Sequence, residues 1–62
     1  MEKKTVVRLS WSSLDGQAEF RPVYDDGSVG AVVQTGLETN DRRFMEKRKA
    51  IENEWLGRVV EV

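Results

Sequence analysis

The first part of the chain alternates between apolar and polar residues, which is the pattern of a half-buried β-strand. This strand is predicted from Thr5 to Trp11. One face would carry Thr5, Val7, Leu9 and Trp11, and the other would carry Val6, Arg8 and Ser10. A second strand is predicted from Gln17 to Tyr24, after a turn at Asp15-Gly16, because glycine accepts the positive φ of tight turns. Pro22 cannot donate a ladder hydrogen bond, so the second strand should lie at an edge there or carry a bulge.

A third strand is predicted from Val29 to Thr35, after a second turn at Asp25–Ser28. Gly30 lies early in this strand, where it would allow a barrel-like bend. Two short turns join the three strands, so we expect them to form an antiparallel meander.

After the third strand, the period of the apolar residues changes from that of a strand to that of a helix. Thr39 or Asn40 is predicted to cap this helix. Asp41 should lie in its first turn, where the helix dipole favours a carboxylate. The helix should run to Leu56, with Gly57 just beyond its C-cap because glycine tolerates the left-handed conformation.

The apolar residues of this helix form one stripe, which is expected to pack on the sheet. The stripe comprises Phe44, Ile51 and Trp55, flanked by Met45 and Leu56. We interpret Trp55 and Met45 as core residues rather than as part of a cofactor site.

A fourth strand is predicted from Arg58 to Val62. Apart from the charge of Glu61, it has little that would prevent edge-to-edge pairing. The element order is therefore β-β-β-α-β, and the fold class is mainly β with one helix. Four strands curling around one helix would form a small open barrel, or a sheet with the helix on one face. At 62 residues, the chain is expected to be one domain, residues 1–62.

The composition argues against an enzyme. The chain has no cysteine and no histidine, which excludes thiolate nucleophiles, Cys/His metal sites and Ser-His-Asp triads. Asp25 and Asp26 lie in a turn without the ligand spacing of a calcium loop, so we predict no metal and no cofactor. The longest apolar run, Ala31–Val33, is far shorter than a membrane span, so we expect a cytoplasmic protein without membrane contact.

The charges are nearly balanced. Ten basic and eleven acidic residues give a formal net charge of −1, so the protein would not bind nucleic acid through bulk charge. A local basic cluster occupies the predicted helix: Arg42, Arg43, Lys47, Arg48 and Lys49. Glutamates are interleaved with it, which is typical of a solvated helix face. The alternative is a phosphate contact, for which Arg42 and Arg43 at the helix amino end are best placed.

Three segments together resemble the C-terminal OB-fold domain of ATP-dependent DNA ligases, especially the phage-type enzymes. They are Asp26–Leu37, Asp41–Arg43 and Trp55–Val62. The resemblance implies a small OB-like open β-barrel, here ending before the family's fifth strand. It does not imply ligase activity, because Ser13-Leu14-Asp15-Gly16 lacks the lysine of the family's Lys-x-Asp-Gly motif.

Two functions stay open. The resemblance implies a non-catalytic module that contacts double-stranded or nicked DNA, with four candidate contacts: Arg8, Arg21, Arg42 and Arg43. The alternative is a structural or interaction domain that forms a homodimer, or pairs with a partner protein, through an open edge at Val59–Val62. Phosphate contacts weaken steeply with salt, whereas strand pairing does not, so salt dependence distinguishes the two.

Overall fold

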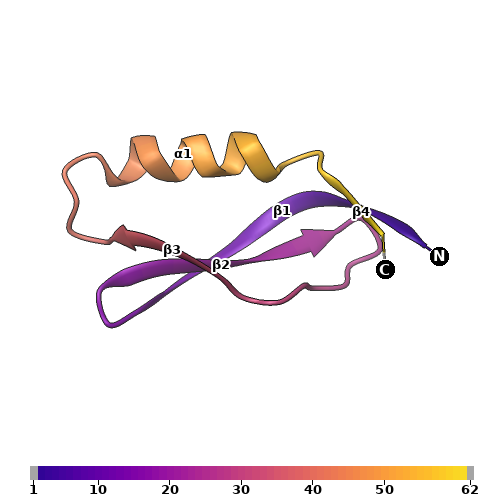
Figure 1. Ribbon diagram of the computed structural model, residues 1–62, viewed down its shortest axis with the longest axis horizontal. Helices are drawn as coiled ribbons and strands as arrows, with labels where there is room; N and C mark the ends of the chain where they lie inside the picture. The colour runs from indigo at the N-terminus through magenta and orange to yellow at the C-terminus, as the bar shows by residue number, and fades with distance from the viewer. Residues whose placement is uncertain (1, 62) are drawn as a thin grey trace.

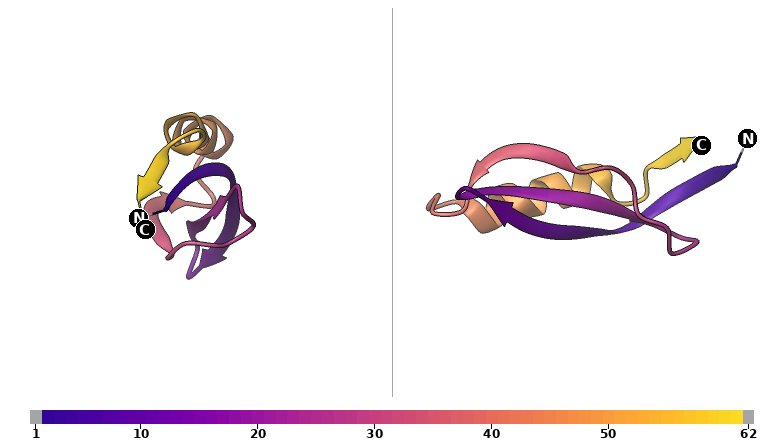
Figure 2. Two further views of the ribbon diagram at one scale, coloured as in Figure 1. Left: turned by 90° about the vertical axis from the view of Figure 1, so that its right-hand side faces the viewer. Right: turned by 90° about the horizontal axis from the view of Figure 1, so that it is seen from below.

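In a computed structural model, residues 2–61 form a four-stranded antiparallel sheet and one α-helix. Strands β1 (Lys3–Leu14), β2 (Gln17–Tyr24) and β3 (Val33–Glu38) precede α1 (Phe44–Trp55), and β4 (Val59–Glu61) follows it. The sheet order is β3-β2-β1-β4 (Figure 1). The strands curl into a half-barrel, and the helix lies along one face of it (Figure 2). The predicted mainly β class, the order β-β-β-α-β and the OB-like open barrel are therefore confirmed.

A β-bulge in β1 changes which of its residues face the core. The register with β2 shifts between Val6 and Arg8, so Val7 is the extra residue. Val6 is buried, whereas Val7 is 54 % exposed. The prediction that Val7 shares a face with Leu9 is wrong, because the bulge interrupts the period of two. Val6 takes its place in the core.

β2 has the predicted bounds, and Pro22 fits into it without loss of a ladder bond. Pro22 lies opposite Leu9 on β1, and its carbonyl accepts the N–H of Gly30 at 2.9 Å. The N–H and C=O of one strand residue point to the same side, so the missing N–H of Pro22 also faces away from β1. On that side β3 pairs with β2 only at Gln17–Phe20. The strand is therefore an edge at Pro22, as predicted.

The third strand starts and ends later than predicted. Val29 makes only an isolated bridge with β2, and regular pairing begins at Val33. Gly30 packs so closely on β2 that an added Cβ would lie 2.6 Å from the Tyr24 hydroxyl oxygen and 2.9 Å from Pro22 Cγ. This close crossing replaces the regular strand that was predicted from Val29.

β3 continues past Thr35 through a bulge. Ala18 pairs with Leu37, while the next residue of β2 pairs with Gln34, so Thr35 and Gly36 are the extra residues. Gly36 has φ +71°, a left-handed conformation that glycine adopts without strain because it has no Cβ. The Thr35 hydroxyl donates to the Ala18 carbonyl at 2.7 Å and accepts the Leu37 N–H at 3.0 Å. These two bonds fix the bulge and let the strand run on to Glu38.

The core lies between the inner face of the sheet and α1. Phe20 and Val6 are each 1 % exposed and form the buried cluster with Leu9. The Phe20 ring centroid lies 5.1 Å from that of Trp11 and 5.2 Å from that of Trp55. Tilted and edge-to-face contacts of this kind are the preferred geometry of aromatic pairs. The prediction that Trp55 belongs to the core is confirmed as a half-buried side chain packed on Phe20.

Met45, by contrast, is not a core residue, because its side chain is 68 % exposed. Ile51 and Trp55 of the predicted stripe do pack against the buried cluster. At 100° per residue, Met45 is about a quarter of a turn away from that stripe, and the narrow sheet beneath does not reach so far around the helix.

The amino end of the helix differs from the prediction. Neither Thr39 nor Asn40 caps it; Arg43 occupies the N-cap position and makes no side-chain capping bond. Instead, the Asp41 carboxylate accepts the N–H of Arg43 at 2.7 Å. An aspartate that bonds the backbone two residues ahead favours a turn over a helix, so α1 starts only at Phe44.

At its other end, α1 stops at Trp55, one residue before the predicted end. Gly57 has the expected positive φ, +84°. The Arg58 N–H donates to the Trp55 carbonyl at 3.0 Å, and Leu56 is extended at φ −63° and ψ 131°. These values describe a type II turn, which requires glycine at its third position.

β4 begins one residue later than predicted, because Arg58 belongs to the turn, and the predicted end at Val62 lies outside the described residues. Val59–Glu61 pairs antiparallel with Lys3–Thr5 at the start of β1. No helix within residues 2–61 is long and apolar enough to cross a membrane.

Candidate nucleic-acid interface

Two of the four candidate arginines are neighbours on the outer face of the sheet. Arg8 and Arg21 alternate with the buried Leu9 and Phe20, so they point away from the helix. The β1–β2 register places Arg8 and Arg21 at diagonal positions. Both are exposed, and neither forms an ion pair with another residue between 2 and 61. Two cations therefore face solvent together.

The other two candidates lie on the helix side of the molecule. Arg42 and Arg43 directly precede α1, which packs on the inner face, and both are exposed. The amino end of the helix already holds a carboxylate, because Asp41 accepts the Arg43 N–H and the Lys47 ammonium, each at 2.7 Å. The bond from Lys47, helped by that from Arg43, lowers the pKa of Asp41. The structure thus separates the four candidates into two pairs, and the second pair directly follows Asp41, a carboxylate of the protein itself.

Two of the five residues of the helical basic cluster are engaged with other side chains. Lys47 is paired with Asp41, and Arg48 is paired with Glu52 at 3.2 Å. Arg48 also lies over the Trp11 ring at 5.0 Å. The i,i+4 pair stabilises the helix itself, and the cation–π contact holds the helix on the sheet. Arg42, Arg43 and Lys49 form no ion pair among residues 2–61.

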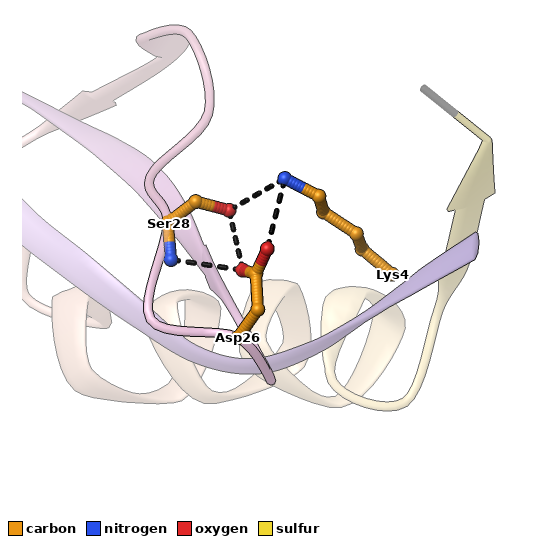
Figure 3. Close-up of polar contacts among 3 residues, drawn as sticks. All are labelled: Lys4, Asp26 and Ser28. Atoms are coloured by element: carbon orange, nitrogen blue, oxygen red, sulfur yellow. Dashed lines mark hydrogen bonds and ion pairs between the residues drawn. The ribbon is translucent and has the colours of Figure 1, made fainter. Parts of the chain in front are cut away.

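A polar cluster that sequence analysis did not identify joins β1 to the β2–β3 turn (Figure 3). The Lys4 ammonium contacts Ser28 Oγ at 2.9 Å and Asp26 Oδ2 at 3.0 Å. Asp26 Oδ1 accepts both the backbone N–H of Ser28, at 2.9 Å, and its hydroxyl. These hydrogen bonds from Ser28, with that from Lys4, hold the pKa of Asp26 at about 2.

The role of this cluster is structural: it links the Asp26–Ser28 turn to Lys4 on β1. Its hydrogen bond to Asp26 raises the pKa of Lys4, so the amine is an ammonium and cannot take a proton from Ser28. The Ser28 hydroxyl in turn donates to Asp26. The Asp26-Gly27-Ser28 turn could have been found in the sequence as an Asx turn, but Lys4 is 24 residues from Ser28 and carries no signal.

A hollow of about 470 Å³ opens between β3 and the Lys47–Ile51 side of α1, and it is exposed to solvent rather than enclosed. Residues 2–61 contain no group of three or more carboxylates placed to hold a metal ion. Asp25 and Asp26, considered above as cation ligands, are both exposed, and Asp26 is occupied by Lys4 and Ser28.

Comparison of the chain with protein-family models, with curated proteins and with solved structures finds no significant match. Functional inference therefore depends on the surface described above.

Proposed function

We propose that the protein is a non-catalytic module that contacts the phosphate backbone of double-stranded nucleic acid through the outer face of β1 and β2. The observation that carries this proposal is the pair Arg8 and Arg21, both exposed at diagonal positions of β1 and β2 and without an ion pair among the described residues. OB-folds bind oligonucleotides on the sheet face around strands 2 and 3, and Arg21 lies on the second strand. The resemblance of residues 26–62 to ligase OB domains supports the same class of ligand.

The placement of the aromatic residues favours a duplex over a single strand. Proteins that bind single strands present aromatic rings on which bases stack. Here Trp11, Tyr24 and Trp55 pack against the buried cluster that contains Phe20, on the inner side of the sheet. Besides Arg8 and Arg21, the outer face of β1 and β2 carries the Ser10 and Ser12 hydroxyls and one carboxylate, Glu19, but no aromatic ring, so it would suit phosphates rather than bases. With a net charge of −1, binding should be weak and strongly dependent on salt.

The experiment measures binding to a nicked, fluorescently labelled duplex by anisotropy at about 50 mM salt, where electrostatic contacts are least screened. Arg8→Glu with Arg21→Glu should abolish measurable binding and remove roughly two units from the salt slope. Arg42→Glu with Arg43→Glu changes the net charge equally and tests the second predicted pair. If this variant loses binding and the first retains it, the interface is at the helix start.

Single variants supply a closer control. Arg21→Glu and Lys49→Glu each change the net charge by two, and both residues are exposed without an ion pair among residues 2–61. Only Arg21→Glu should weaken binding. Equal losses would show that net charge, rather than the outer face, controls the affinity.

Absence of catalysis is tested separately. Incubation with labelled ATP and magnesium should leave no covalent label on the protein, because none of its lysines lies in a Lys-x-Asp-Gly context. A label that survives denaturation would contradict the non-catalytic assignment.

A second candidate, pairing through the open edge of β4, is favoured by one observation. Among residues 2–61, β4 pairs with β1 alone, and Val59 at its start is 56 % exposed. Strand pairing through this edge predicts concentration-dependent dimers that persist at high salt. Sedimentation at low and high salt tests it, and a monomer at all concentrations would exclude homodimer formation.

A further inference from the structure

The chain contains two Asp-Gly dipeptides, and each lies in a tight turn after a strand. Asp15-Gly16 joins β1 to β2, and Asp26-Gly27 follows β2. An aspartate that precedes glycine can close a five-membered succinimide ring, because glycine has no side chain to hinder attack by its backbone nitrogen. Since the two dipeptides are identical, a difference in their reactivity has to come from their surroundings in the fold.

Ring closure requires two reacting groups, a protonated aspartate carboxyl and the N–H of the following glycine. The glycine nitrogen forms a bond to the aspartate Cγ, and the bond from Cγ to its hydroxyl oxygen breaks. One water molecule leaves, made of that hydroxyl and the proton of the glycine N–H. A second water then opens the ring. Opening at the former main-chain carbonyl gives isoaspartate, in which the main chain runs through the aspartate side chain.

At Asp26-Gly27 both reacting groups are already engaged (Figure 3). The Asp26 carboxylate accepts the Ser28 N–H at 2.9 Å and the Ser28 hydroxyl, and it contacts the Lys4 ammonium at 3.0 Å. The Gly27 N–H donates to the Tyr24 carbonyl at 3.0 Å. With the pKa of Asp26 at about 2 instead of 3.8, the protonated fraction at mildly acid pH is smaller by a factor on the order of fifty.

At Asp15-Gly16 neither reacting group is engaged by another residue between 2 and 61. The Asp15 carboxylate accepts no hydrogen bond and forms no ion pair there, and the Gly16 N–H donates no hydrogen bond. Both residues are exposed, beside an open hollow of about 270 Å³ that gives water access to the turn. Exposed turns open locally at low free-energy cost, so Asp15 can leave its left-handed conformation, φ +53°, for the ring to close.

We propose that Asp15 is a modification site, at which the folded protein forms succinimide and then isoaspartate, and that the contacts of Asp26 protect the second dipeptide. The site matters for the fold because the Gly16 carbonyl accepts the Thr39 N–H at 2.8 Å and the Thr39 hydroxyl at 3.2 Å. These bonds join the turn to the segment between β3 and α1. Isoaspartate adds one atom to the main chain of a two-residue loop, which strains the Leu14–Gln17 pair and these bonds.

The experiment compares the two dipeptides within one protein. The folded protein is incubated for several weeks at about pH 5, where a small fraction of an ordinary aspartate is protonated. Cleavage after glutamate separates the two sites, because Glu19 lies between them. Electron-transfer fragmentation then distinguishes isoaspartate from aspartate in each fragment. Isoaspartate should form at Asp15 about tenfold faster than at Asp26, or more, because only Asp26 is held ionised.

The same incubation in guanidinium chloride is the control for the fold. There the two rates should agree within about threefold, because unfolding removes the contacts of Asp26. The proposal would be overturned by similar rates in the folded protein, or by a faster reaction at Asp26. It would also be overturned if isoaspartate formed at Asp15 only after denaturation. A preference for Asp15 that is equally large in the denaturant would show that neighbouring sequence, and not the fold, causes it.

Variants test the protection of Asp26 directly. Lys4→Ala with Ser28→Ala removes its side-chain partners and should raise the rate at Asp26 by about fivefold or more, without changing the rate at Asp15. Lys3→Ala with Ser10→Ala is the matched control, since both residues are exposed, and it should change neither rate. If the first double variant does not fold by circular dichroism, Ser28→Ala alone should give a smaller increase at Asp26. An unchanged rate at Asp26 in a folded variant would refute the protection.

Discussion

Phe20 is the residue on which the stability of this fold should depend most. Its ring is 1 % exposed and lies between Trp11 and Trp55, at centroid distances of 5.1 and 5.2 Å. Truncation of a buried phenylalanine to alanine costs about 3–5 kcal/mol, because apolar contact is lost and a cavity remains. A single core in a domain of this length rarely supplies more than about 3–5 kcal/mol of stability. Phe20→Ala should therefore be largely unfolded without denaturant.

Trp55 provides the comparison. It is half-buried, with Arg58 over its ring at 4.1 Å, so part of its area is exposed even in the folded protein. The free-energy cost of Trp55→Ala should be about 2 kcal/mol, below that of Phe20→Ala. The sequence pattern alone would predict Trp55→Ala to cost more free energy of unfolding than Phe20→Ala, because the apolar stripe of the helix does not show how deeply each residue of the sheet is buried.

The assay is urea unfolding followed by far-UV circular dichroism, which does not depend on either tryptophan. Phe20→Leu keeps most of the apolar area and should cost about 1–2 kcal/mol, so a folded variant is available if Phe20→Ala gives no transition. With a slope of about 1 kcal/mol per molar urea, this moves the midpoint by roughly 1–2 M. A cooperative Phe20→Ala transition close to that of the parent, together with a larger loss in Trp55→Ala, would refute the proposed core.

Three further variants test separate contacts. Asp26 has a lower pKa folded, about 2, than its ordinary 3.8, so its contribution is complete above about pH 4 and is lost as the pH falls toward 2. In Asp26→Asn, the melting temperature should therefore decrease less between about pH 4 and pH 2 than in the parent. The same pH dependence of the melting temperature in both proteins would contradict a stabilising ion pair between Asp26 and Lys4. Gly30→Ala should destabilise the fold by about 1–3 kcal/mol in the same urea assay, because the added Cβ would lie 2.6 Å from the Tyr24 hydroxyl oxygen. Trp11→Phe should change stability by less than about 1 kcal/mol, since it removes an indole N–H that is buried without a hydrogen-bond partner among residues 2–61; a large loss would indicate a partner for that N–H.

The ends of helices and strands were predicted correctly from the sequence where a single residue type determines the backbone conformation. Asp15-Gly16 is a turn, with φ +53° and +77°, and β2 begins at Gln17 as predicted. Gly57 ends the helix with positive φ for the same reason. In each case the conformation follows from the residue itself, so no tertiary contact needs to be known in advance.

Features that depend on contacts between distant residues could not be predicted. The bulge at Val7 exchanges an exposed valine for the buried Val6, and two adjacent valines give no sign of which one faces inward. Met45 and Trp55 are both apolar helix residues, yet the sheet is wide enough to cover only the second. The Lys4–Asp26 ion pair depends on the register of β1 against β2, which alternation does not determine.

The outer-face contact can be separated from a general effect of charge. Arg8 and Arg21 lie on the outer face of the sheet, whereas Lys49 lies on α1, which packs on the inner face. A duplex contact on the outer face should be weakened by Arg8→Glu and by Arg21→Glu but not by Lys49→Glu. Because the three substitutions carry the same change in charge, equal losses of affinity in all three variants would contradict the outer-face contact.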